Sequence, residues 1–248
     1  MFDFLQDLAH SHQKYIFRLQ SVRLPDHEHP MDRSVLDPHL VRDLKDRQLT
    51  AVPLLASLLF DDSKLFGFMI DRNLLVRLRD DHSLLDDHLQ LRSQLLQNEN
   101  MAALYLNNII LAIQKWLETN NNANAKFTKP QRYFSSAGSK KPVSGPISRK
   151  PDISVLPLVD GKTLRQDSIN WKYIHAIIEI TRTDKLTSLM LNQCHTKRFL
   201  MGLYQGDRHF APCISVTNNK FRFMISDHEG EVQSASHTLN PEGTIIFL

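Results

Sequence analysis

The chain has 248 residues, of which 42% are hydrophobic and 23% charged, and its formal net charge is +3. This length permits one large domain or two small ones, and the composition is that of an ordinary globular protein. The sequence contains no stretch of 18 apolar residues, so a membrane-spanning helix is not expected. The small net charge does not by itself require a nucleic-acid partner.

The N-terminus and the two cysteines indicate the cellular compartment in which the protein is expected. Residues 1–7 carry acidic side chains and lack the basic segment that opens a secretory signal peptide. Cys194 and Cys213 lack the spacing of a disulfide framework or a zinc finger, so we expect two buried thiols in a reducing compartment. An intracellular location, cytoplasmic or nuclear, is therefore predicted, although a secreted protein whose signal peptide has been removed would look the same.

Residues 1–98 are predicted to form a helical region. Apolar side chains recur at intervals of three and four residues in the segments 2–20, 37–60 and 83–97. The clearest helix follows at residues 99–118, where the apolar stripe is so wide that packing on more than one side is expected.

Residues 126–150 are predicted to form a basic loop. This stretch holds seven basic side chains, no acidic one, and many Ser, Gly and Pro residues. Three aromatic residues stand among the cations, so bases can stack there while Lys140, Lys141, Arg149 and Lys150 meet phosphates. A solvated linker and a docking surface for an acidic protein are the alternatives.

Beyond residue 150 the hydrophobic period changes to that of strands. Strands are predicted at residues 153–158, 173–180, 210–216, 221–226 and 244–247. A helix is predicted at residues 185–205. The expected fold class is α+β, with the helical region 1–98 packed on a small α/β domain at residues 99–248.

Two acidic residues stand on the first two of these strands. Asp152 opens one strand and Glu179 lies near the end of the next, so both carboxylates point at one spot if the strands pair. Neighbouring carboxylates repel one another and commonly recruit a divalent cation. A lysine two residues after the glutamate would complete a Mg²⁺-dependent phosphodiester-cleaving site. Thr181 stands there instead, and Arg182 and Lys185 are the nearest substitutes.

At Pro151-Asp152 and at Glu179 the sequence resembles the PD-(D/E)XK nuclease fold. The resemblance implies a small mixed sheet with Asp152 and Glu179 as metal ligands. It also implies that Glu99 is an additional acid from the upstream helix. The helix after the second strand would border the site, with Arg198 facing phosphate. A solvent-exposed polar face is the alternative for that side of the helix.

Several short blocks are similar to the region that precedes the kinase lobes in fungal-type protein kinases. They are Arg149–Ser154, Ile177–Ile180, Gln193–Leu203 and Phe221–Gly230. No glycine-rich phosphate loop, HRD-like loop or DFG motif accompanies them, so phosphoryl transfer is not expected. The resemblance implies a fungal origin and a free-standing module that acts on other proteins, as a secreted effector does inside a host cell.

With the acids retained and the lysine replaced, the sequence favours a non-catalytic protein-interaction module with a degenerate nuclease-like fold. Such a module binds a protein partner, needs no cofactor and has no membrane partner. Two alternatives stay open. The first is a Mg²⁺-dependent nuclease that uses Asp152, Glu179, Glu99 and a relocated Lys185 or Arg182. The second is a nucleic-acid-binding protein that acts without cleavage.

Overall fold

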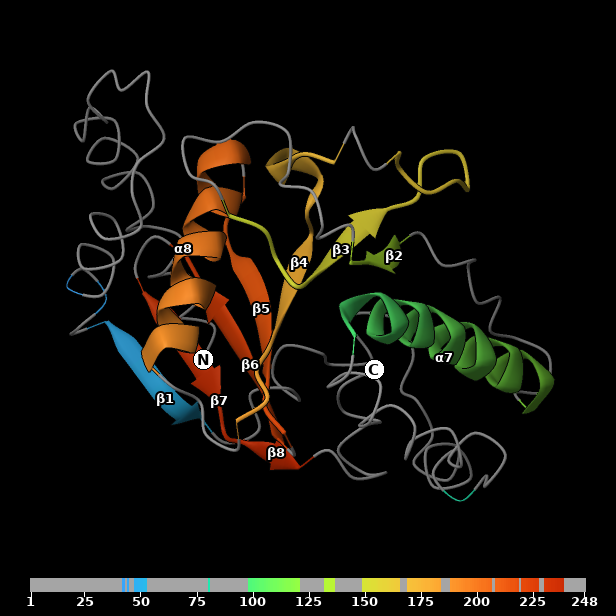
Figure 1. Cartoon of the computed structure of the whole chain (residues 1–248), viewed down its shortest axis with the longest axis horizontal. Coiled ribbons are helices and arrows are strands. Elements are labelled where there is room, and N and C mark those ends of the chain that lie inside the picture. The colour runs from blue at the N-terminus through green and yellow to red at the C-terminus, as the bar shows by residue number, and fades with distance from the viewer. Residues whose placement is uncertain are drawn as a thin grey trace, which may run out of the picture.

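A computed structural model of the chain describes residues 47–52, 98–120, 132–136, 149–165, 169–183, 188–206, 208–218, 220–227 and 230–238, and the single residues 42, 44 and 80. These residues contain an eight-stranded mixed sheet and two long helices (Figure 1). The helices are α7 (Glu99–Asn120) and α8 (Ser188–Tyr204), with a 3₁₀ turn, η2, at Trp171–Tyr173. The strands are β1 (Gln48–Val52), β2 (Arg132–Ser135), β3 (Ile153–Pro157), β4 (Ala176–Ile180), β5 (Ala211–Val216), β6 (Lys220–Ser226), β7 (Glu231–Ser234) and β8 (His237–Thr238). The predicted mixture of helix and sheet is confirmed for this part of the chain.

The strands lie in the order β1-β7-β6-β5-β4-β3-β2, and β8 pairs with β6. Two neighbouring pairs are parallel, β4 with β5 and β1 with β7. Parallel neighbours need a crossover connection, and α8 supplies it between β4 and β5.

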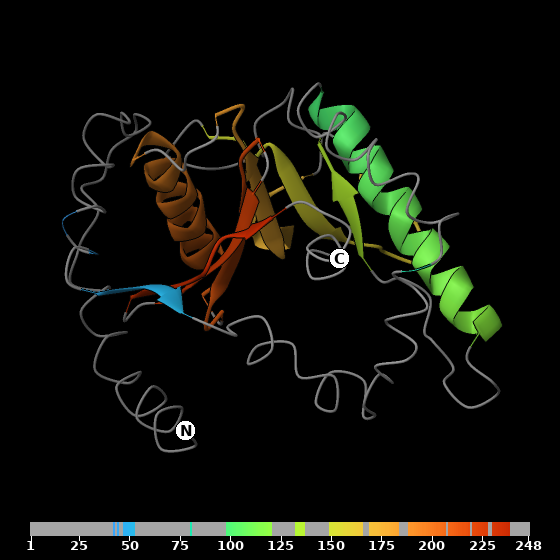
Figure 2. The same ribbon diagram turned by 90° about the horizontal axis from the view of Figure 1, so that it is seen from below.

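The two helices cover opposite faces of the sheet (Figure 2). Successive side chains of a strand point to opposite faces, and on β4 Ile177 belongs to one buried cluster while Ile178 belongs to the other. Met201 of α8 packs in the first cluster and Leu106 of α7 in the second. The sheet is therefore the middle layer between two helices.

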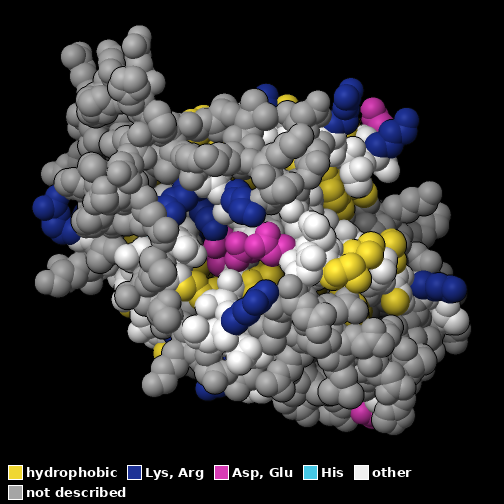
Figure 3. All heavy atoms as spheres, in the orientation of Figure 1, with side chains coloured by type: hydrophobic (Ala, Val, Ile, Leu, Met, Phe, Trp, Pro, Cys, Tyr) yellow, Lys and Arg dark blue, Asp and Glu magenta, His cyan; other side chains and the backbone are white. Residues whose placement is uncertain are grey.

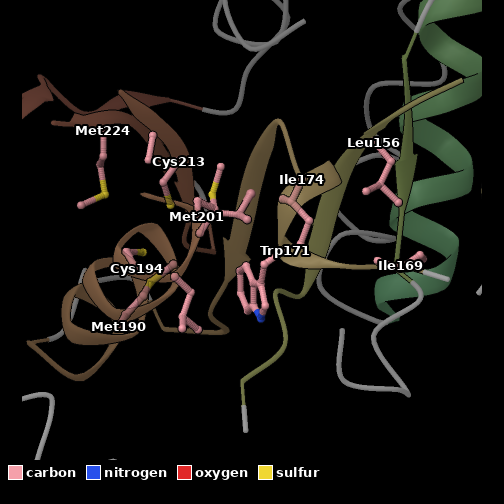
Figure 4. Close-up of a cluster of buried hydrophobic side chains, with 12 residues drawn as sticks. Leu156, Ile169, Trp171, Ile174, Met190, Cys194, Met201, Cys213 and Met224 are labelled. Atoms are coloured by element: carbon pink, nitrogen blue, oxygen red, sulfur yellow. The ribbon is translucent and has the colours of Figure 1, made fainter. Parts of the chain in front are cut away.

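The core beneath α8 is built around Trp171, which is fully buried (Figure 4). Cys194 of α8 and Cys213 of β5 lie in the same core, and both are free thiols. The prediction of two buried thiols is thus confirmed. Neither of the described helices is long and apolar enough to cross a membrane.

Helix α7 begins where the side chain of Asn98 caps it, because Asn98 Oδ1 accepts a hydrogen bond from the backbone N–H of Asn100 at 2.8 Å. One face of the helix is buried on the sheet. On another face Met101, Leu104 and Leu111 remain about half exposed, so the expected packing on more than one side is not observed for these residues.

Asn107 of α7 protects an edge of the sheet. Its Nδ2 donates to the carbonyl oxygen of Phe134, and its Oδ1 accepts from the backbone N–H of Phe134, both at 2.8 Å. Phe134 lies on β2, which has a single neighbour in the sheet. The amide therefore occupies backbone groups that an exposed edge strand would offer to another chain.

Two predictions about the first part of the sequence are wrong where the structure describes it. Residues 48–52 form strand β1 within the predicted helix 37–60, and residues 132–135 form strand β2 within the predicted loop 126–150. In both cases pairing with a partner strand overrides the local pattern. The remaining helical predictions for residues 1–98, apart from a few isolated positions, and the strand predicted at 244–247 lie outside the described residues.

A close backbone approach holds β1 at the sheet edge. The backbone N–H of Glu231 donates to the carbonyl oxygen of Arg47 at 2.9 Å. A Cβ atom placed on Gly230 would overlap with the same oxygen. Glycine is therefore required where the chain enters β7.

Candidate active site

The pairing of β3 with β4 brings Asp152 and Glu179 together. Ile153 lies opposite Ile178 in the antiparallel register, so the next pair outward joins Asp152 with Glu179 on the same face. The backbone N–H of Asp152 donates to Glu179 Oε1 at 3.3 Å, and the backbone N–H of Ile180 donates to Asp152 Oδ2 at 2.7 Å. The predicted convergence of the two acids is confirmed, and the backbone fixes one oxygen of each.

A lysine reaches this pair from helix α8. Lys197 Nζ donates to Glu179 Oε2 in an ion pair, and the two side chains are only 6% and 1% exposed. Thr181 contributes no charge, and its hydroxyl group contacts the hydroxyl group of Thr183 at 3.2 Å. The ammonium group that the sequence lacks at position 181 is therefore present, but it comes from a different element.

The two residues predicted to substitute for that lysine are not seen at the acid pair among the residues that the structure describes. Arg182 is exposed, and Lys185 lies outside the described residues. Sequence reasoning missed Lys197, although a signal for its burial exists. Lys197 follows Cys194 by three residues and precedes Leu200 and Met201 by three and four, so it falls on the buried side of the helix.

Arg198, predicted to face phosphate, lies elsewhere. Its side chain is 1% exposed, and Nη2 pairs with the buried carboxylate of Glu231 on β7. The same carboxylate accepts from Gln233 Nε2 and lies 3.0 Å from His195 Nε2. The prediction is wrong because this side of α8 packs on the sheet instead of bordering solvent. Its alternative, a solvent-exposed polar face, is wrong for the same reason.

This second cluster determines how α8 sits on the sheet. Glu231 belongs to β7, and Gln48 of β1 contacts His195 Nε2 at 3.4 Å. The contacts join α8 to two strands that are remote from it in sequence. Because Arg198 is held on one side of the helix, the preceding residue, Lys197, is directed toward Glu179.

Glu99 stands at the rim of the acid pair, in the first turn of α7. Its Oε2 lies 3.7 Å from Lys150 Nζ, and both side chains are about two-fifths exposed. Partial burial raises the pKa of Glu99, repulsion from Asp152 raises it further, and attraction to Lys150 and Lys197 opposes the increase. Glu99, the predicted third acid, therefore interacts electrostatically with Asp152 and Lys197.

The acidity of Glu179 is strongly perturbed. Its complete burial raises its pKa from 4.5 to about 7, because desolvation outweighs the attraction of Lys197 and Asp152 adds repulsion. Perturbed carboxyl groups of this kind occur both at catalytic sites and in structural ion pairs. Beside this carboxyl group lie Asp152 and the buried Lys197.

Basic side chains lie above and below an acidic patch on one face of the molecule. Figure 3 shows Asp and Glu side chains gathered near the middle of the face drawn in Figure 1, with Lys and Arg side chains above and below them. Arg149 and Lys150 stand shortly before Asp152 in the chain, and Lys150 contacts Glu99. Lys140 and Lys141, the other predicted phosphate contacts, lie outside the described residues.

The carboxylates have the chemistry that a magnesium ion needs. Among the residues that the structure describes, no set of three or more His, Cys, Asp or Glu side chains is arranged around one point. Mg²⁺ does not require such a cage, because it keeps several waters and is usually bound through one or two carboxylates and substrate phosphates. Asp152 and Glu179 fit that donor set.

Comparison of the chain with protein-family models, with curated proteins and with solved structures gave no match. What the site can do therefore follows from its own geometry. It combines two neighbouring carboxylates, a buried ammonium group paired with one of them and a third carboxylate at the rim.

Proposed function

We propose that the chain is a divalent-metal-dependent phosphodiester hydrolase of the nuclease type. The observation that carries this proposal is the contact of Lys197 with Glu179, opposite Asp152. The case for a degenerate site depended on the missing lysine at position 181. A buried lysine that reaches the same carboxylate from α8 removes that objection.

The arrangement of the elements also supports the proposal. Asp152 directly precedes β3 and Glu179 lies on the adjacent β4, a helix borders the pair, and Glu99 begins a helix on the other face of the sheet. This layout is the one that the resemblance to the PD-(D/E)XK nuclease fold implies. The fold-level likeness adds to the site geometry and does not replace it.

Each side chain has a distinct role in this proposal. Asp152 and Glu179 would hold Mg²⁺, which when bound neutralises phosphate charge and lowers the pKa of its water. Lys197 holds the attacking water and stabilises the developing negative charge. Lys150, partly exposed at the rim, meets a neighbouring phosphate, and Glu99 limits how far that lysine turns away from the site.

The acid pair can be tested by matched substitutions. Wild-type protein is incubated with single- and double-stranded DNA and RNA in Mg²⁺, in Mn²⁺ and in EDTA. We expect metal-dependent cleavage that Asp152→Asn lowers at least about a hundredfold. Asp160→Asn changes an exposed acid in a turn and should leave cleavage unchanged. Absence of cleavage by the wild type in both metals, or full activity of Asp152→Asn, contradicts the proposal.

A second candidate function is a protein-interaction module, and the exposed apolar side chains of α7 favour it. Met101, Leu104 and Leu111 are 45%, 52% and 55% exposed and share one side of the helix. A photo-crosslinking residue placed at Leu104 should capture a defined protein partner, whereas one placed at Lys172 should not. Equal capture from the two positions would contradict this candidate.

A further inference from the structure

Lys197 occupies the only oxygen of Glu179 that the backbone leaves open. Glu179 Oε1 accepts from the backbone N–H of Asp152 at 3.3 Å, and Oε2 accepts from Lys197 Nζ. Asp152 Oδ2 in turn accepts from the backbone N–H of Ile180 at 2.7 Å. The ammonium group therefore holds the position on Glu179 from which a second cation would be bound.

A doubly charged ion and an ammonium group repel one another strongly when both contact one carboxylate in a dry environment. The side chain of Lys197 is a point charge on a flexible four-carbon chain, so it can leave one anion for another without moving its helix. A substrate phosphate is the anion that the proposed reaction brings to this place.

We infer that Lys197 is an exchangeable counter-ion, which leaves Glu179 when a divalent cation is bound there and then contacts the substrate phosphate. The inference rests on the proposed function and adds an order of binding to it. The cation binds first, because Lys197 is paired with Glu179 until the cation arrives. The phosphodiester binds second, because only then is the ammonium group available to it.

The neighbouring ion pair shows why the helix itself stays in place. Arg198 is held to Glu231 by a guanidinium contact, and the same carboxylate also contacts His195 and Gln233. These contacts join α8 to β7 whatever Lys197 does. The structure thus combines a fixed cation and a movable one at consecutive positions of one helix.

Chemical labelling of lysines tests this exchange without a substitution in the site. The 248-residue chain is treated with a limiting amount of an acetylating N-hydroxysuccinimide ester, with and without saturating Ca²⁺, and the labelling of each lysine is quantified by mass spectrometry. Ca²⁺ is the probe because it prefers oxygen ligands and has no redox chemistry. We expect labelling of Lys197 to rise at least about tenfold with Ca²⁺, because its side chain is only 6% exposed in the pair.

Two controls define the result. Lys220 is exposed on β6 and should be labelled at the same rate with and without Ca²⁺. Asp152→Asn should abolish the effect of Ca²⁺ on Lys197.

Each remaining outcome separates the exchange from the proposed function. The melting temperature of the protein is measured in parallel, with and without Ca²⁺. If Ca²⁺ raises the melting temperature while labelling of Lys197 stays unchanged, the exchange is refuted and the nuclease proposal stands. If Ca²⁺ changes neither quantity, the exchange is refuted and the metal-binding role of the acids with it. If Ca²⁺ speeds the labelling of Lys197 but the protein cleaves no nucleic acid, the release of Lys197 by the cation is supported. The catalytic role of Lys197 is then refuted.

Discussion

Replacement of Glu179 by Gln should remove a specific pH dependence from the stability of the fold. The pKa of Glu179 is about 7 in the folded protein, against 4.5 for an ordinary glutamate. Between these values the folded state keeps a proton that the unfolded state has lost, so the free energy of unfolding falls as the pH rises. The difference between the two pKa values corresponds to about 3 kcal/mol in the free energy of unfolding. This is a large part of the roughly 5–15 kcal/mol by which a typical domain is stable. This contribution is complete below pH 4.5 and is lost as the pH rises through about 7.

Urea unfolding, followed by circular dichroism between about pH 4.5 and 8.5, measures this dependence directly. The difference between wild type and Glu179→Gln isolates the carboxyl group, and the same comparison is made in a Lys197→Met background, which lacks the ammonium partner of Glu179. In Lys197→Met the loss of stability should extend to higher pH, because Lys197 lowers the pKa of Glu179. Wild-type and Glu179→Gln stabilities that run parallel across the whole range would refute this reasoning.

Two further substitutions test the contacts that position the site. Asn107→Ala leaves both backbone groups of Phe134 without their side-chain partner and should destabilise the protein by about 1–3 kcal/mol. The control is Asn108→Ala, which changes an exposed residue and should be neutral or slightly stabilising. Equal effects of the two substitutions in thermal unfolding would show that the edge contact contributes nothing to stability. Arg198→Met leaves the carboxylate of Glu231 without its guanidinium partner and should cost about 3–5 kcal/mol. Adding Glu231→Met should recover more than half of that loss in urea unfolding, and a double variant as unstable as the single one would contradict the account.

Several regular elements could be predicted from sequence, because each is a long helix or a strand with a mostly buried apolar run. Helices α7 and α8 follow from helical spacing, and β3 and β4 follow from apolar runs of strand length. Strands β1, β2 and β7 could not be predicted. β2 and β7 have only four residues, β1 is mostly exposed, and each is defined by the strand with which it pairs.

At the site, too, some features could be predicted from sequence and others could not. Asp152 and Glu179 could be placed together from sequence, because antiparallel pairing puts the residue before one strand opposite the penultimate residue of the next. The roles of Lys197 and Arg198 could not. Charged side chains are almost never fully buried unless they are paired, so their spacing on α8 suggests burial but not a partner. Only the position of α8 over the sheet assigns one cation to Glu179 and the other to Glu231.

The rate of metal-dependent nucleic-acid cleavage by Lys197→Met tests the central claim most directly. Lys220→Met is the matched control, since it removes an exposed lysine from β6. Both variants are compared with wild type in Mn²⁺ on the substrate that the wild type cleaves best. The account predicts at least about a hundredfold slower cleavage by Lys197→Met and an unchanged rate for Lys220→Met. Equal rates for wild type and Lys197→Met, with the variant still folded, would show that the lysine on Glu179 is not part of a catalytic site.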